Sequence, residues 1–183
     1  MNFLKNTEMP IIINLSQEKQ IEAENMKNSN IFNVIRRGTL EQYKLSITRV
    51  NIDVCNEYGQ NLLQESISSN KDMISIDLLE RNIDINHQDG NGQTPLHFCA
   101  QYLNTHIAEL LLQNNANVNI IDNFGNNPLW TAVFCAHGDY QIVKLFMKYG
   151  ADAHHKNKAG RSPSDFAHQI EDFDMLDILL NHK

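Results

Sequence analysis

Residues 89–121 read DGNGQTPLHFCAQYLNTHIAELLLQNNANVNII, and the organisation of the whole chain follows from this stretch. Thr94-Pro95 predicts the start of a helix, because threonine caps free backbone N–H groups and proline is tolerated at the first helical position. A second helix is predicted from about Thr105 to Asn114-Asn115, since asparagine tolerates the left-handed conformation with which many helices end. The two glycines at positions 90 and 92 predict a turn before the first helix.

The apolar residues of this stretch recur at helical spacing. On the first helix they are Leu96, Cys99 and Ala100, and on the second they are Ile107, Leu110 and Leu111. The small residues at 99 and 100 allow another helix to pack closely. We therefore expect Leu96 and Leu111 to be buried between these two helices and their neighbours.

The same unit recurs along the chain. Glycines stand at positions 59, 92, 125 and 160, at intervals of 33, 33 and 35 residues, and each is followed by a related tetrad: NLLQ at 61–64, TPLH at 94–97, NPLW at 127–130 and SPSD at 162–165. A period near 33 residues with Thr-Pro-Leu-His is the signature of ankyrin repeats. From about Asn30 onward, the chain therefore resembles the ankyrin-repeat family.

This resemblance implies an all-α solenoid of helix-turn-helix units joined by short β-hairpin loops, with about five repeats including degenerate terminal ones. The expected domain covers residues 30–183, divided into 30–55, 56–88, 89–121, 122–156 and 157–183. The fourth unit carries two extra residues around 134–138, between its two helices. Insertions in solenoids often fall on the binding face.

Residues 1–29 lie outside the repeat pattern. Residues 9–15, MPIIINL, are apolar but too few to span a bilayer, and the flanking sequence does not fit a signal peptide. We expect an arm whose isoleucines cover the exposed edge of the first repeat. Arg36, Arg37 and Arg49 are interpreted as the solvated surface of that terminal repeat.

The composition limits the possible partners. The 183 residues carry a net charge of −7, which argues against binding nucleic acid or an anionic membrane, since both need clustered lysine and arginine. Cys55, Cys99 and Cys135 lie far apart, and Cys99 stands at a small core position. We interpret it as a buried free thiol and expect a reducing, cytoplasmic location, with non-classical secretion left open.

The sequence offers no catalytic or metal-binding pattern. It contains no nucleophile elbow, no phosphate-binding glycine loop and no CxxC pair, and His154-His155 are neighbours that point to opposite faces of an extended segment. The resemblance implies that His97 hydrogen-bonds backbone between repeats. We therefore predict a protein that is not an enzyme, needs no cofactor and unfolds independently of metal.

The family resemblance places the loop tips and first helices along a concave groove. The groove-facing positions predicted to bind a partner are Glu57, Tyr58, Asp89, Asn91, Gln93, Tyr102, Asn123, Phe124, Trp130 and Phe134. Trp130 stands where the family has its tetrad histidine. For Trp130 and Phe134 two interpretations remain open at this point, an exposed aromatic surface or core filling beneath the insertion.

The predicted function is to bind another protein through this groove, as a monomer when free. An acidic chain favours a partner with a basic surface. One hypothesis is a bacterial inhibitor or immunity protein that blocks a cognate toxin or enzyme. The alternatives are an adaptor or secreted bacterial effector that targets a host protein, the regulatory subunit of a separate enzyme, and a self-assembling structural protein.

Overall fold

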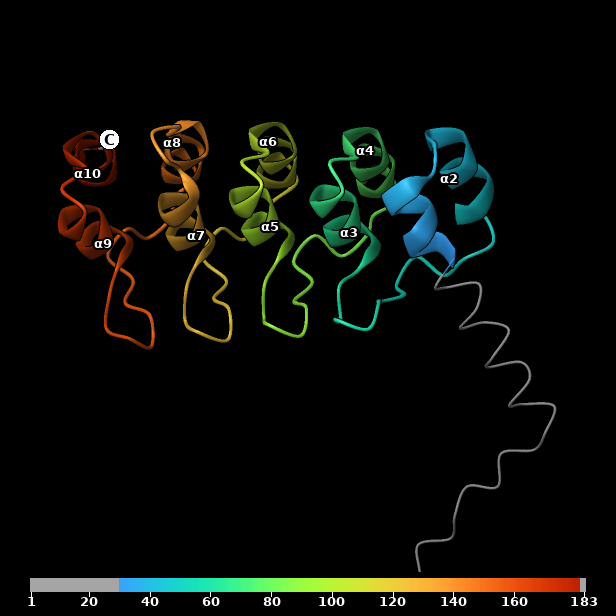
Figure 1. Ribbon diagram of the computed structural model, residues 1–183, viewed down its shortest axis with the longest axis horizontal. Coiled ribbons are helices and arrows are strands. Elements are labelled where there is room, and N and C mark those ends of the chain that lie inside the picture. The colour runs from blue at the N-terminus through green and yellow to red at the C-terminus, as the bar shows by residue number, and fades with distance from the viewer. Residues whose placement is uncertain (1–29, 182–183) are drawn as a thin grey trace, which may run out of the picture.

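The computed structural model describes residues 30–181, and the arm predicted for residues 1–29 lies outside them. A first helix covers residues 30–37 and pairs with α2 (Leu40–Ile47). The later pairs are α3 (Leu62–Ser68) with α4 (Asp72–Glu80), α5 (Pro95–Gln101) with α6 (Thr105–Gln113), α7 (Pro128–Cys135) with α8 (Gln141–Lys148), and α9 (Pro163–Gln169) with α10 (Phe173–Asn181). Figure 1 shows the pairs standing in one row, with the loops between pairs projecting to the same side. The predicted all-α solenoid is confirmed.

The helix ends follow the tetrads. Asn61, Asn127 and Ser162 are N-cap residues whose side-chain oxygens accept the backbone N–H three residues later, at 2.9–3.1 Å. Thr94 is the N-cap of α5, and its own N–H donates to Nδ1 of His97. At the other end of the unit, Asn115 has a φ of 66°, which confirms the predicted left-handed residue after α6.

The core runs through every helix pair. Leu96 and Leu111 are at most 1% exposed, and Cys99 and Ala100 are fully buried, so the predicted helix faces of the third repeat are correct. Leu110 is half-buried at the edge of the same core. The extra residues of the fourth unit lie between α7 and α8, as predicted, in a connection that spans residues 136–140 where the third repeat uses residues 102–104.

The loops that project from the row are here called tip loops and are numbered by the repeat that they open: residues 56–60 form the second tip, 89–93 the third, 122–126 the fourth and 157–161 the fifth. In each, the side-chain oxygen of the first residue accepts the backbone N–H groups two and four residues later, at 2.8–3.1 Å. The residues that do this are Asn56, Asp89, Asp122 and Asn157. Among the described residues, β-pairing is limited to one isolated bridge between Cys55 and Asn61, so the side chains shape these loops.

Neighbouring tip loops are joined by backbone hydrogen bonds. The N–H groups of Gly90, Asn123 and Lys158 donate to carbonyl oxygens of the preceding tip at 2.9–3.0 Å. Gly125 has a φ of 80°, and a Cβ on it would lie 3.0 Å from the backbone nitrogen of Lys158. The glycine period therefore reflects both the left-handed turn and the close approach of the next tip.

The N-terminal end contains an ion pair that the sequence did not suggest. Arg36 is exposed, as expected for solvated surface, and its guanidinium also donates to both carboxylate oxygens of Glu65 in α3, at 2.6 and 2.9 Å. This bond to Glu65 raises the pKa of Arg36. This ion pair joins the first repeat to the second. A guanidinium can donate two parallel hydrogen bonds to one carboxylate, which makes such a pair strong. Across residues 30–181, no helix has the length and apolar character needed to cross a membrane.

Candidate protein-binding surface

A hollow of about 370 Å³ opens between the third and fourth tip loops and α7, and we call it the groove hollow. The third tip contributes Asn91 and Gln93, the fourth contributes Asp122, Phe124 and Asn126, and α7 contributes Trp130, Thr131 and Phe134. Half of the ten predicted contact residues thus meet in one place: Asn91, Gln93, Phe124, Trp130 and Phe134. Residues 43 positions apart are brought together because each repeat adds its tip and first helix to the same face.

The aromatic side chains of the groove hollow are accessible. Phe124 is 65% exposed and Phe134 is 59% exposed, while Trp130 is half-buried. Phe166 of α9 supports the last two, with ring centroids 5.5 Å from Trp130 and 5.7 Å from Phe134. Phe134 is therefore not a core filler, and Trp130 is partly packed and partly open.

Sequence reasoning missed Phe166. It stands three residues after Pro163, as Phe98 stands three residues after Pro95 in the third repeat. Phe98 is buried because a further repeat covers it, whereas Phe166 is half-buried on the last helix pair described. The repeated Pro-x-x-Phe spacing was a signal that could have found it.

The tetrad positions make different contacts in successive repeats. Gln64 donates from Nε2 to the carbonyl oxygen of Gln93 at 2.7 Å. His97 accepts from Thr94 N–H on Nδ1 and donates from Nε2 to the carbonyl oxygen of Asn126 at 3.1 Å, which confirms its predicted role. Among the described residues, the indole of Trp130 has no such partner, so its ring is available to line the groove hollow.

Asp89 requires a correction. It was predicted to contact a partner, but it is only 7% exposed, and its Oδ1 accepts two backbone N–H groups of its own tip at 2.9 Å. Its Oδ2 is buried and has no hydrogen-bond partner among residues 30–181. Asp122 is equally buried and shapes the fourth tip in the same way. The turn of the tip loop needs an acceptor oxygen at this position, which is why the carboxylate faces inward.

The remaining predicted residues lie outside the lining of the groove hollow. Glu57 and Tyr58 are exposed on the second tip, and Tyr102 is exposed just after α5. Asn123 is exposed, but its side-chain amide donates to the carbonyl oxygen of Gly90 at 3.0 Å and so helps to join two tips. These residues extend the same face toward the N-terminal repeats.

Two histidines, each lying just before a tip loop, bond the preceding tip loop, which the sequence did not suggest. His87 bonds the carbonyl oxygen of Gly59 at 2.7 Å, and His155 bonds that of Gly125 at 2.9 Å. His154 is exposed, whereas His155 is half-buried. Within the described part of the chain, no group of three potential metal ligands occurs.

The three cysteine thiols share one electrostatic feature. Burial raises the pKa of Cys99, Cys55 and Cys135, and all three are free cysteines. A raised pKa disfavours the thiolate, which is the reactive form. Cys99 is fully buried, as predicted.

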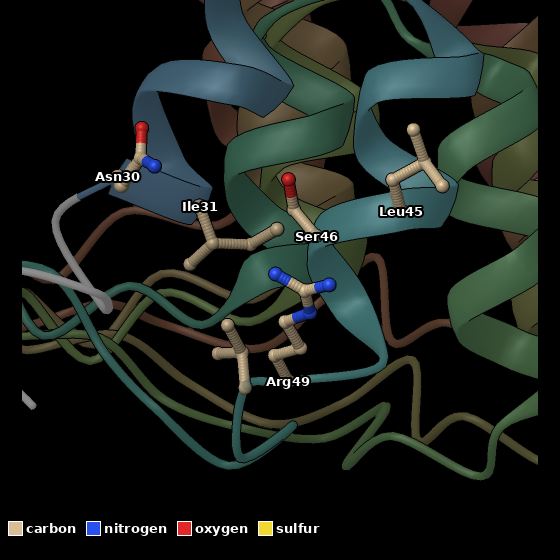
Figure 2. A pocket seen from close by; sticks show the side chains of 6 residues that line it. Asn30, Ile31, Leu45, Ser46 and Arg49 are labelled. Atoms are coloured by element: carbon tan, nitrogen blue, oxygen red, sulfur yellow. The ribbon is translucent and has the colours of Figure 1, made fainter.

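A second hollow, of about 580 Å³, lies at the N-terminal end of the row. Figure 2 shows its labelled side chains coming from the first helix (Asn30, Ile31) and from α2 and the turn after it (Leu45, Ser46, Arg49). Leu45 is well exposed here, but none of the described residues that line this hollow is aromatic. The groove hollow is therefore the stronger candidate for recognition.

Comparison with known proteins gives a consistent result. A family model for ankyrin repeats in three copies matches residues 23–122 and 63–157. A putative ankyrin repeat protein of Rickettsia bellii is 33% identical over 75% of this chain and 41% of its own length. A neurogenic locus notch homolog protein 1 of Xenopus tropicalis is 32% identical over 68% of this chain and 5% of its own.

A glycerophosphocholine phosphodiesterase of Candida albicans is also similar, with 34% identity over 66% of this chain but only 10% of its own length. The chain thus spans less than half of each of these relatives. The ankyrin-repeat family is generally non-enzymatic, so the similarity does not carry the phosphodiesterase activity to this chain.

Proposed function

Because the chain belongs to the ankyrin-repeat family, we propose that it binds another protein through its concave face, with the groove hollow at the centre of the interface. The observation that carries this proposal is the group of accessible aromatic side chains, Phe124, Trp130 and Phe134, gathered in one depression. Large aromatic residues in central pockets dominate the binding energy of many protein interfaces. Repeats of this family support protein–protein interaction in general.

The rigidity of the face supports the same proposal. Backbone bonds join each tip loop to the next, and Gln64 and His97 add side-chain links between repeats. A surface that is already ordered loses little conformational freedom on binding. This favours a chain that acts by occupying its partner, as an inhibitor or immunity protein does, without catalysis of its own.

Charge favours a basic contact surface on the partner. Glu57 is exposed beside Tyr58 on the second tip, and the carboxylates of Asp89 and Asp122 have no lysine or arginine within 4 Å among the described residues. The proposed setting is reducing and cytoplasmic, in keeping with three free thiols, and the free chain is proposed to be a monomer.

The test starts with affinity isolation and identification of the partner, followed by binding measurements on purified proteins. Phe124→Ala should weaken binding, while Phe173→Ala serves as the matched control, since Phe173 is 71% exposed on α10. Equal affinity of Phe124→Ala and the unmodified chain would contradict the proposal. If the partner is an enzyme or toxin, loss of its activity on binding supports an inhibitor. Retained activity supports an adaptor or effector.

A further inference from the structure

We infer that the groove hollow receives an arginine side chain of the partner, an inference that rests on the proposed function and names the chemistry of its central contact. Three features of the hollow point to a flat cation with an apolar stem. They are the open aromatic rings, a carboxylate without a cationic partner, and neutral polar side chains at the rim.

The aromatic rings supply the first feature. Trp130 is held in place by Phe166, with ring centroids 5.5 Å apart, and Phe134 is held by the same ring. Trp130 is half-buried and lines the hollow. A guanidinium stacks flat on such a ring and is attracted to its electron-rich face, and tryptophan is the strongest side chain for this interaction.

Asp122 supplies the second feature. It lines the hollow, and its Oδ1 is used by the N–H groups of Phe124 and Asn126. Among residues 30–181, its Oδ2 receives only the side-chain amide of Asn126, in a long bond of 3.3 Å. No lysine or arginine of the described residues lies within ion-pair distance of Asp122. A guanidinium in the hollow would provide the missing positive charge.

The lysine of the neighbouring fifth tip does not fill this role. Lys158 belongs to the fifth tip, and its ammonium donates to the backbone carbonyl of Asn123 at 2.7 Å. It is not part of the lining of the hollow. The hollow therefore combines aromatic walls with an uncompensated carboxylate.

Other occupants fit less well. An apolar side chain would exclude water from Asp122 without replacing its hydrogen bonds, which is unfavourable for a carboxylate. An acidic side chain would be repelled. Lysine carries the charge, but its ammonium is compact, strongly hydrated and unable to stack flat.

The single tryptophan of the chain makes the inference testable without the partner. Blocked pentapeptides, acetyl-Gly-Gly-X-Gly-Gly-amide, are titrated into the full chain while the fluorescence and the indole N–H signal of Trp130 are followed. X is arginine, its uncharged isostere citrulline, lysine or leucine. The arginine peptide should give a saturable change, and the citrulline peptide should bind roughly tenfold more weakly, since a partly desolvated cation–π contact is worth about that factor.

Asp122→Asn removes the negative charge of Asp122 while keeping the fold of the tip loop. Asn56 and Asn157 occupy the same position in other tips and make the same two backbone hydrogen bonds, so asparagine preserves the turn. This variant should lose most of its preference for arginine over citrulline. Asp89→Asn, which removes the same charge one repeat away, should retain it.

Three results would overturn the inference: no peptide perturbs Trp130, the leucine or citrulline peptide binds as well as arginine, or Asp122→Asn keeps the full preference. None of these would contradict partner binding through the groove, which is measured separately with Phe124→Ala. Conversely, arginine binding with a partner insensitive to Phe124→Ala would count against the proposed function alone.

Discussion

The third and fourth repeats use the same position of the tetrad for different purposes. In the third, His97 is buried and bonds both its own N-cap residue and the next tip. In the fourth, Trp130 stands 33 residues later, is half-buried and lines the groove hollow. One architectural position can therefore either join two repeats or present a side chain to a partner, and the choice of residue decides which.

The fourth repeat replaces the missing histidine bond with other contacts to the fifth. Phe166 of the fifth repeat packs against Trp130 and Phe134. Tyr140, at the end of the longer α7–α8 connection, donates to Asp172 at 2.9 Å. The solenoid stays continuous here although the tetrad bond is absent.

The largest expected difference between the two repeats is in how much a core substitution lowers the free energy of unfolding. Leu96→Ala or Leu111→Ala should each lower the free energy of unfolding by about 2–5 kcal/mol, because a fully buried leucine leaves a cavity. Phe134→Ala, in the fourth repeat, should change it by less than about 1 kcal/mol, since Phe134 is mostly exposed and its truncation leaves no enclosed cavity. Urea unfolding followed by circular dichroism measures all three.

If Phe134→Ala destabilised the chain as much as Leu111→Ala, Phe134 would be a core residue and the two repeats would not differ as described. A loss below about 0.5 kcal/mol for Leu111→Ala would likewise show that the core of the third repeat is misplaced.

Much of this fold was predictable because its constraints are local. The glycine period marks tips where a Cβ would collide with the next tip, and Asn115 marks a left-handed helix end. Leu96 and Leu111 follow from helical spacing and are buried as expected. These features depend on backbone geometry that particular residue types satisfy, so the sequence shows them directly.

The candidate site was less predictable, because the sequence does not distinguish an acidic side chain that faces solvent from one that bonds its own backbone. Asp89 was assigned to the surface, yet it shapes its tip as Asn56 does. The recurrence of Asn or Asp before each glycine was the available signal, since either residue offers the acceptor oxygen that the turn needs. The pairing of Arg36 with Glu65 joins residues 29 positions apart and has no pattern in the sequence.

Changes at the groove should have the next largest effect, this time on binding. Tyr58→Ala and Phe124→Ala should each weaken partner binding by more than about 1 kcal/mol, as expected for aromatic anchors. Trp130→His, which restores the residue of the third repeat, should weaken binding to a similar extent, because it removes an aromatic wall of the groove hollow. Calorimetric titration with the isolated partner measures the affinity, and circular dichroism verifies the fold.

The opposite face provides the control for these variants. Glu80, Glu109 and Lys144 belong to the second helices α4, α6 and α8, away from the tip loops. Alanine at these positions should leave the affinity within about 0.5 kcal/mol of the unmodified chain. Affinity that was lost here but kept in both Tyr58→Ala and Phe124→Ala would place the interface on the second helices.

The smallest effect concerns pH and His97. Burial lowers the pKa of His97 below its ordinary value of 6.5, and the bond to Asn126 and the carboxylates of Asp122 and Asp89 oppose this shift only in part. The unfolded chain therefore binds a proton more readily than the folded one. The stability that the neutral ring contributes is complete above pH 6.5 and is lost as the pH falls below it toward the lowered pKa.

His97→Gln separates this titration from the structural role, because Gln64 makes the equivalent bond to the next tip in the second repeat. Urea unfolding at pH ~7.5, ~6.5 and ~5.5, on either side of the usual histidine pKa, should show a smaller loss of stability in this variant than in the unmodified chain. His155→Gln is the comparison, because His155 bonds a neighbouring tip but is only half-buried. If the pH dependence of stability were unchanged in His97→Gln, protonation of His97 would not be the cause of the stability lost at low pH.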